Sequence, residues 1–446
     1  MTGDRTPSRA IPLLYLGTAH VSLALAAGVA AVWPRAVAGF FYHSWMVAIV
    51  HLVTLGWITF SILGAIYIVG PLALRMPFPA GRRDYWAYGF ALVGLVGMVG
   101  HFWIQEYAGM AWSAATAAVG ILYVAFRLVR ALPQAGIPTA VKLHLAFASA
   151  NITLAASMGI LLGFDKAYHF LPGFVLSNVF AHAHLAAIGW ATMMVVGIGY
   201  RLLPMILPSK MPDDASMSIG AVVLEAGVLG LCVSLLFGSG WSLAAGALVV
   251  AGLAVFAAHV VWMLRSPAPK PVGAPRVDFA VLHAAGAGVS LLAAATIGVA
   301  LLVLPASPST LRAAAAYGVL GLVGFLSQMV VAMEARLLPM ATWYWRYAQS
   351  EFRVPPPAPF TMRDRALQAI VFAGWTSAVP LLAAGLFFES PGLVAAGAWS
   401  LVAAVLVMTL DTLGVVLIVK TARAPTPGGC EVLIDVAPTL ETKTAL

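Results

Sequence analysis

Residues 51–71 read HLVTLGWITFSILGAIYIVGP, and residues 184–204 read HLAAIGWATMMVVGIGYRLLP. At an offset of 133 residues the two stretches share a histidine, a leucine, two glycines, a tryptophan, a threonine, a tyrosine and a proline. A third, partial copy follows, because MVVGIGYRLLPM at 194–205 recurs as MVVAMEARLLPM at 329–340. The histidine position of this copy holds Val319. The pattern predicts a unit repeated three times, with the histidine present in two copies.

The composition predicts a membrane protein whose main partner is the lipid bilayer. Hydrophobic residues make up 62% of the 446 residues and charged residues 9%, whereas soluble domains carry about 25% charged residues. The net charge of +8 does not indicate nucleic-acid binding, because the basic residues lie in short loops between apolar segments. Two cysteines, Cys232 and Cys430, are too few for a disulfide framework or a thiolate metal cluster. We expect no cleavable signal peptide.

The fold class expected is all-α and polytopic, since a membrane span needs about 20 apolar residues. We expect one transmembrane domain over residues 1–425, made of three four-helix units at about 1–135, 136–270 and 271–425, then a flexible cytoplasmic tail at 426–446. The loop at 342–366 contains PPPAPF and is expected to be irregular. The twelve predicted spans are 11–33, 44–72, 86–104, 109–131, 139–163, 174–206, 217–238, 241–264, 277–304, 310–341, 367–388 and 391–420.

The distribution of basic residues predicts the orientation of the chain. Of the 24 lysines and arginines, only Arg35, Lys166 and Arg312 fall on the odd-numbered loops. The positive-inside rule therefore predicts that both termini are cytoplasmic. His51 and His184 would then lie roughly two helical turns below the outer surface. Parallel repeats of this kind imply a pseudo-threefold axis along the membrane normal.

The motif His182-Ala183-His184 is the main candidate site, because an ionisable residue inside a membrane is costly and indicates function. On a helix, residues two apart differ by about 200°, so the two rings face different clefts. Under the expected symmetry, His51 shares a cleft with His182, whereas His184 faces the third unit. There Tyr317 is the residue equivalent to His182.

Two further features accompany each histidine. Trp57 and Trp190 follow the histidines by six residues and are expected to pack against a helix or a cofactor. Glycines also recur, at 56 and 64 in the first copy and at 189 and 197 in the second. Small residues in membrane helices permit close helix packing, and the same lack of bulk would make room for a flat macrocycle. Both interpretations are open from the sequence.

The string HAHLAAIGWATMMVVGIGYRLLP resembles the helix of subunit I of haem-copper oxidases that carries a His-x-His pair, above all in the cbb3-type and nitric oxide reductase branch. The chain is also similar to the NnrS family, which is connected with nitric oxide. The resemblance implies twelve helices in three arcs, a bacterial inner-membrane location and one or two b-type haems. It also implies a quinol or cytochrome electron donor, with partner subunits. The haem ligands implied are His51, His182 and His184, with Trp57, Trp190 and Tyr317 near the cofactor.

The chain departs from the oxidase pattern at the copper site. It has no adjacent His-His pair, so oxygen reduction at copper is not assigned and an enzymatic activity stays open. His20 is either a third ligand or a hydrogen-bonded structural residue. Alternative functions are transport of copper or another metal, and a non-catalytic role in the response to nitric oxide or in oxidase assembly. Glu334, Glu225 and Asp411 are intramembrane acids that could carry protons or hydrogen-bond a neighbouring helix.

Overall fold

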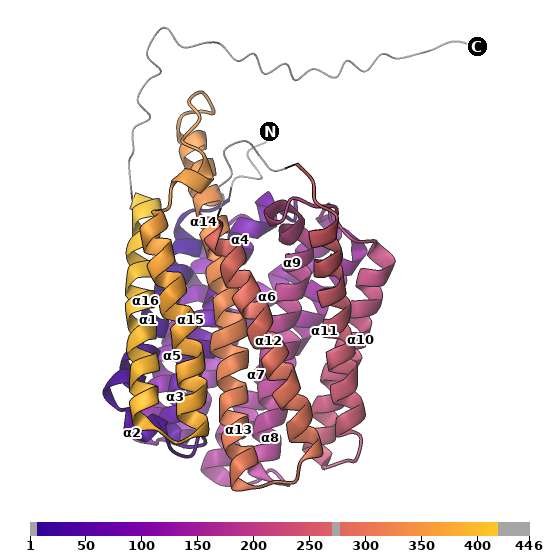
Figure 1. Cartoon of the computed structure of the whole chain (residues 1–446), viewed down its shortest axis with the longest axis vertical. Coiled ribbons are helices and arrows are strands. Elements are labelled where there is room, and N and C mark those ends of the chain that lie inside the picture. The colour runs from indigo at the N-terminus through magenta and orange to yellow at the C-terminus, as the bar shows by residue number, and fades with distance from the viewer. Residues whose placement is uncertain (1–6, 270–276, 418–446) are drawn as a thin grey trace, which may run out of the picture.

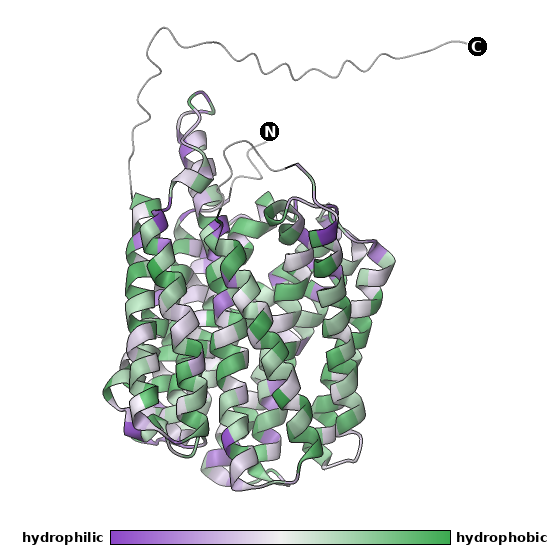
Figure 2. Cartoon of the chain, in the orientation of Figure 1, coloured by the Kyte–Doolittle hydropathy of each residue, from purple (hydrophilic) through white to green (hydrophobic). Residues whose placement is uncertain are grey.

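The computed structural model describes residues 7–269 and 277–417, and the regular elements in these residues are helices. Within these described residues, twelve helices are long and apolar enough to cross a membrane, as the sequence predicted. Figure 1 shows them side by side and roughly parallel. Figure 2 shows apolar residues along most of their length and hydrophilic residues mainly near the ends. The predicted tail at 426–446 lies outside the described residues.

The helices that form continuous spans begin and end within a few residues of the predicted bounds. Short α2 (Pro34–Val37) and the 3-10 helices η3 (Leu132–Gln134) and η6 (Pro359–Thr361) lie in loops. The continuous spans are α1 (Ala10–Val32), α5 (Arg82–Ile104), α6 (Tyr107–Ala131), α7 (Thr139–Tyr168), α10 (Asp214–Phe237), α11 (Ser242–Arg265), α12 (Phe279–Val303), α15 (Arg365–Phe387) and α16 (Pro391–Leu417).

The second, sixth and tenth spans each change from α-helix to π-helix and back. Each π-helical segment is eight residues long and begins directly after His51, His184 or Val319. Such segments are rare and are frequent at functional sites. The three spans are α3 (Ser44–His51), η2 (Leu52–Thr59) and α4 (Phe60–Leu72); α8 (Val175–His184), η4 (Leu185–Thr192) and α9 (Met193–Ile206); and α13 (Pro308–Val319), η5 (Leu320–Ser327) and α14 (Gln328–Gln349).

The same packing recurs around each π-helix. Helix α1 packs against η2 and α4, α7 against η4 and α9, and α12 against η5 and α14. The pairs α5–α6, α10–α11 and α15–α16 pack closely as neighbouring spans. The three π-helical segments also contact one another, and α1 packs against α16. The repeated sequence therefore lies together at the centre of the molecule.

The glycines of the repeat allow these helices to approach closely. A Cβ atom at Gly56 would lie 2.4 Å from Cβ of Ser22, and one at Gly189 would lie 2.8 Å from Cβ of Asn151. Gly64 faces Tyr15, and Gly197 faces His144, in the same way. Of the two interpretations that the sequence left open, helix packing therefore accounts for all four glycines.

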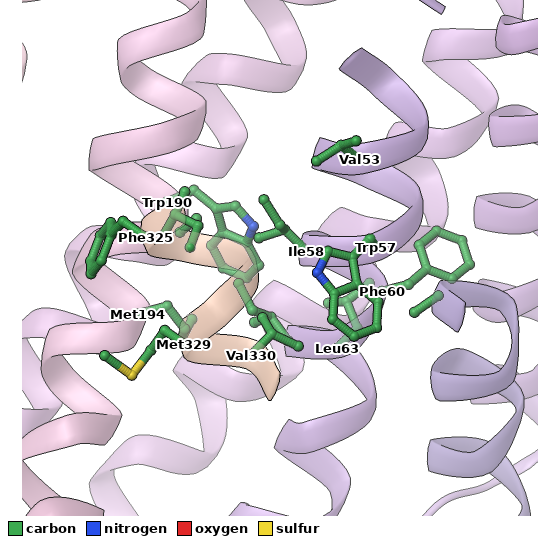
Figure 3. Packing of buried hydrophobic residues seen from close by; sticks show 14 of the residues in the cluster. Val53, Trp57, Ile58, Phe60, Leu63, Trp190, Met194, Phe325, Met329 and Val330 are labelled. Carbon is green, nitrogen blue, oxygen red and sulfur yellow. The ribbon is translucent and has the colours of Figure 1, made fainter. Parts of the chain in front are cut away.

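The core is built around two tryptophans of the repeat. Trp57 is completely buried and Trp190 is 1% exposed. Figure 3 shows the two indoles on facing helices, with Ile58 between them in this view. The Trp190 indole N–H donates to Oγ1 of Thr59 over 3.2 Å and so joins η4 to η2. Trp57 and Trp190 thus pack in the core, as expected.

One expected loop is partly helical. The sequence predicted irregular structure over 342–366, whereas α14 continues to Gln349 and projects beyond the bundle in Figure 1. The reason is that the added turns have partners. Trp345 is 6% exposed, and its indole N–H donates to the carbonyl of Pro7 over 2.9 Å. The Trp343 indole donates to the carbonyl of Pro356 over 3.2 Å.

Candidate functional site

A cavity of about 760 Å³ lies against the three interrupted spans. This volume is within the range of about 300–1,000 Å³ that ligand sites usually have. Its walls are mostly aliphatic, and the polar side chains among them are few. Those that bear on chemistry are His51, His182, His184, Tyr317 and Lys166. The cavity therefore brings together all three histidines of the predicted site.

Each of these histidines is oriented by a backbone carbonyl. Nδ1 of His51 lies 2.8 Å from the carbonyl oxygen of Val47, and Nδ1 of His184 lies 2.7 Å from that of Phe180. Nδ1 of His182 lies 3.0 Å from the carbonyl oxygen of Ala155 on α7. Because a carbonyl can only accept, Nδ1 is the protonated nitrogen in a neutral ring. The lone pair is then on Nε2, which is the arrangement found in many metal-binding histidines.

The two histidines of the His-x-His motif have different neighbours. His182 lies against Gly159 and the carbonyl of Ala155, both on α7. Nε2 of His184 instead lies 3.2 Å from the hydroxyl oxygen of Tyr317, and the two rings stack at 5.9 Å. In the described part of the chain, Nε2 of His51 and of His182 has no hydrogen-bond partner. His51 and His182 therefore each present an Nε2 atom whose lone pair is free.

Two glycines lie against rings of the site. Gly159 on α7 and Gly298 on α12 both line the cavity. A Cβ atom at Gly159 would lie 2.9 Å from Cε1 of His182, and one at Gly298 would lie 3.2 Å from Cε2 of Tyr317. His182 and Tyr317 are equivalent residues in the repeat. The repeat does not point to these two glycines, because Gly159 precedes His182 by 23 residues whereas Gly298 precedes Tyr317 by 19.

A cation lies at one end of the cavity. Lys166 was expected on an odd-numbered loop, but it lies in the last turn of α7 and lines the cavity. Its Nζ is 5.0 Å from the ring centre of Tyr42 and 4.7 Å from that of Tyr107. Burial, with a smaller effect from Asp165, raises the pKa of Tyr42, so this phenol is a neutral donor near neutral pH. Together these groups form a site for an anionic substituent.

Two predicted site residues lie outside the cavity wall. Trp57 is behind the wall, and its ring is 5.5 Å from that of His20. His20 lies 3.0 Å from a carboxylate oxygen of Glu334 through Nε2 and 2.8 Å from Oγ1 of Thr409 through Nδ1. Both of its ring nitrogens are thus already paired. Trp190, in contrast, lines the cavity together with the histidines.

The cavity combines groups that could hold a cofactor: two imidazole Nε2 atoms on α3 and α8, each on a ring fixed by a backbone carbonyl, apolar walls and the ammonium group of Lys166. Within residues 7–269 and 277–417, no three His, Cys, Asp or Glu side chains form a group that could hold a bare metal ion.

No protein-family model matches the chain, and no curated protein is significantly similar to it.

Proposed function

We propose that the chain is an integral-membrane haem protein resembling subunit I of the haem-copper oxidases, and that His51 and His182 are the axial ligands of one b-type haem. The observation that carries the proposal is the pair of free Nε2 atoms on neighbouring spans, each on a ring fixed by a backbone carbonyl. The haem would be held without a covalent link, since the chain contains no CxxCH motif.

Each group of the cavity has a part in this proposal. His51 and His182 would hold the iron, and Gly159 leaves room for the His182 ring. Lys166, with the neutral phenol of Tyr42, would neutralise the carboxylates of the cofactor at the cavity end. A haem bound in this way supplies reversible one-electron chemistry, and the apolar walls limit the access of water.

Electron transfer is the function that two histidine ligands support best, because they leave no open coordination position. His184 and Tyr317 form a second candidate pair on the other face of α8. A second haem held there by His184 alone would have an open side for a diatomic gas such as nitric oxide or oxygen. The proposed partners are a quinol or cytochrome donor and further subunits in a bacterial inner membrane.

The proposed arrangement is three four-helix units related by a pseudo-threefold axis along the membrane normal, with both termini in the cytoplasm. It is supported by the three π-helices at matching positions of the repeat. It is supported equally by the concentration of lysine and arginine on the even-numbered loops.

The test is to purify the protein in mild detergent and measure its haem and metal content. We expect one haem per chain, or two if His184 also binds one, that acidified organic solvent extracts completely. The reduced-minus-oxidised spectrum should be that of a six-coordinate b-type haem. An unchanged spectrum with carbon monoxide would identify electron transfer, and a shifted one would identify gas binding. Protein that carries copper or another metal but no haem would refute the proposal and favour metal transport.

A further inference from the structure

A cluster of charged side chains lies inside the bundle, away from the haem site. Nε2 of His20 is 3.0 Å from Oε2 of Glu334, and Oε1 of Glu334 accepts a hydrogen bond from Thr412 over 2.6 Å. Arg363 donates to Oδ2 of Asp411 over 2.7 Å and lies 3.6 Å from Oε1 of Glu334. The four ionisable side chains are at most 7% exposed. They join α1, α14 and α16 to the segment that precedes α15.

The hydrogen bonds determine how many protons this cluster holds. The hydroxyl of Thr409 donates its single hydrogen to the carbonyl of Val405 over 2.7 Å. Thr409 must therefore accept from Nδ1 of His20, 2.8 Å away. Nε2 of His20 faces the carboxylate of Glu334, which also only accepts when ionised. One proton must therefore lie between Nε2 of His20 and Oε2 of Glu334. With that proton on His20 the ring is an imidazolium, and with the proton at either atom the cluster of His20, Glu334, Arg363 and Asp411 is electrically neutral.

The cluster lies close to the molecular surface on one side. Oδ1 of Asp411 accepts from the backbone N–H of Asp364 over 3.1 Å. Asp364 is exposed and lies directly before α15, on the side of the bundle where α1 begins. The chain of polar contacts therefore runs from this surface through Asp411, Arg363 and Glu334 to His20.

The cluster also borders a small cavity in the middle of the bundle. Glu334 lines a space of about 70 Å³ between α4, α9 and α14, which is enough for about two water molecules. The hydroxyl of Ser61 lines the same space and has no hydrogen-bond partner in the described residues. Trp57 packs against His20, and its buried indole N–H also has no hydrogen-bond partner in the described residues. Unpaired polar groups thus lie next to the ion pair.

We propose that the His20–Glu334 pair is a proton-binding site that exchanges protons with the aqueous side on which α1 begins. Transfer of the Nε2 proton of His20 to Oε2 of Glu334 gives a neutral imidazole and a neutral carboxyl group. Loss of that proton to water on this side leaves His20 neutral and Glu334 ionised, and changes the cluster charge from zero to −1. Uptake of a proton reverses both steps. The site does not require the haem.

Ionisable groups inside a membrane are expensive and are typical of proton pathways, but an ion pair could also serve only to join helices. The two roles differ in whether His20 changes its protonation state. The test is solid-state NMR of the full chain in lipid bilayers, with isotope-labelled histidine ring nitrogens. The signal of His20 is identified by its loss in His20→Gln.

We expect two protonated ring nitrogens on His20 near neutral pH and reversible conversion to one as the pH is raised. In Glu334→Gln the carboxylate is lost, so His20 should already carry a single ring proton near neutral pH. Glu225→Gln is the matched control. Glu225 is also a buried carboxylate within a span, but its hydrogen-bond partner is the neutral side chain of Asn151. This variant should leave the His20 signal as in the wild type.

Two results would overturn the proposal. One is a His20 with a single ring proton near neutral pH in the folded wild-type protein. The other is a His20 that keeps both protons at every pH at which the fold persists, which would identify a structural ion pair. Glu334→Asp keeps the carboxylate and provides a folded variant if Glu334→Gln does not fold.

Discussion

Gly159 is the residue at which the cavity wall meets His182, the proposed haem ligand. A methyl group there would lie 2.9 Å from Cε1 of His182, which is closer than carbon atoms pack, so the ring must move. We predict that Gly159→Ala lowers the haem content or shifts the optical spectrum. Gly288→Ala is the control, because nothing lies within 4 Å of a Cβ atom at that glycine. Equal spectra for the two variants would contradict this role of Gly159.

His20 illustrates what the sequence could not determine at the scale of residues. A histidine in the middle of an apolar segment was visible, and a structural or a ligand role was open. Which role His20 has depends on its contacts with Glu334 and Thr409, which lie 314 and 389 residues away from His20 in the sequence. No local pattern reports such pairings. For His182 the repeat gives a sharper prediction, because the rotation expected between equivalent units places it in the cleft of His51.

At the scale of elements, the π-helices depend on glycines that face the preceding span. A Cβ atom at Gly324 would lie 2.8 Å from Cβ of Ser290, whereas one at Gly321 in the same π-helix would meet nothing within 4 Å. We predict that Gly324→Ala destabilises the protein by about 1–3 kcal/mol, as overpacking usually does, and that Gly321→Ala does not. Thermal unfolding in detergent, followed by fluorescence, would measure both. Equal losses of stability would show that the close contact is unimportant.

The start of α10 gives a pH-dependent prediction. The side chain of Asp213 accepts from the backbone N–H of Ser216 over 2.8 Å and from its hydroxyl over 2.6 Å. These bonds lower the pKa of Asp213 in the folded state. Its contribution to stability is therefore present above the unfolded pKa of about 3.9 and is lost as the pH falls through the lower folded value.

We accordingly expect Asp213→Ala to unfold at a lower temperature than the wild type near neutral pH, and the difference to shrink in strong acid. Asp213→Asn is the control, because a neutral amide oxygen can still accept from Ser216 without titrating. The alanine variant and the wild type could instead differ in unfolding temperature by the same amount near neutral pH and in strong acid. That result would contradict the role of the Asp213 carboxylate.

The existence of the helices was predictable, whereas their internal geometry was not. Apolar length gave the twelve spans, and the repeat indicated which three are equivalent. The change to π-helix after His51, His184 and Val319 was not predicted, because an apolar segment can form either an α-helix or a π-helix. Similarly, α14 extends to Gln349 because distant backbone carbonyls accept from its tryptophans.

At the scale of the whole molecule, the charge distribution predicts orientation. Three of 24 basic residues lie on the odd-numbered loops, so the side on which α1 begins should face the cytoplasm. Reporter fusions at the loop after residue 209 and at the loop after residue 238 would test this. We expect the first to report a cytoplasmic location and the second an external one. The reverse result would place the proposed proton exchange of His20 on the external side.

The cavity is also a property of the whole molecule. The repeat predicted that Tyr317 lies in the cleft that His184 faces, but nothing in the sequence indicated that Lys166 would reach the cavity. The contacts of Lys166 join α7 to the loop before α3 and to the start of α6, and the Tyr317 contact joins α13 to α8. They depend on how separate spans are placed side by side, which hydropathy and local spacing do not specify.

The measurement that tests the central proposal most directly is the reduced-minus-oxidised optical spectrum of purified His51→Ala, His182→Ala and His184→Ala beside the wild type. We predict that the first two variants lose the six-coordinate b-type signature and that His184→Ala keeps it. Loss of the signature in His184→Ala alone, with His182→Ala unchanged, would contradict the assignment of His51 and His182 as the axial pair.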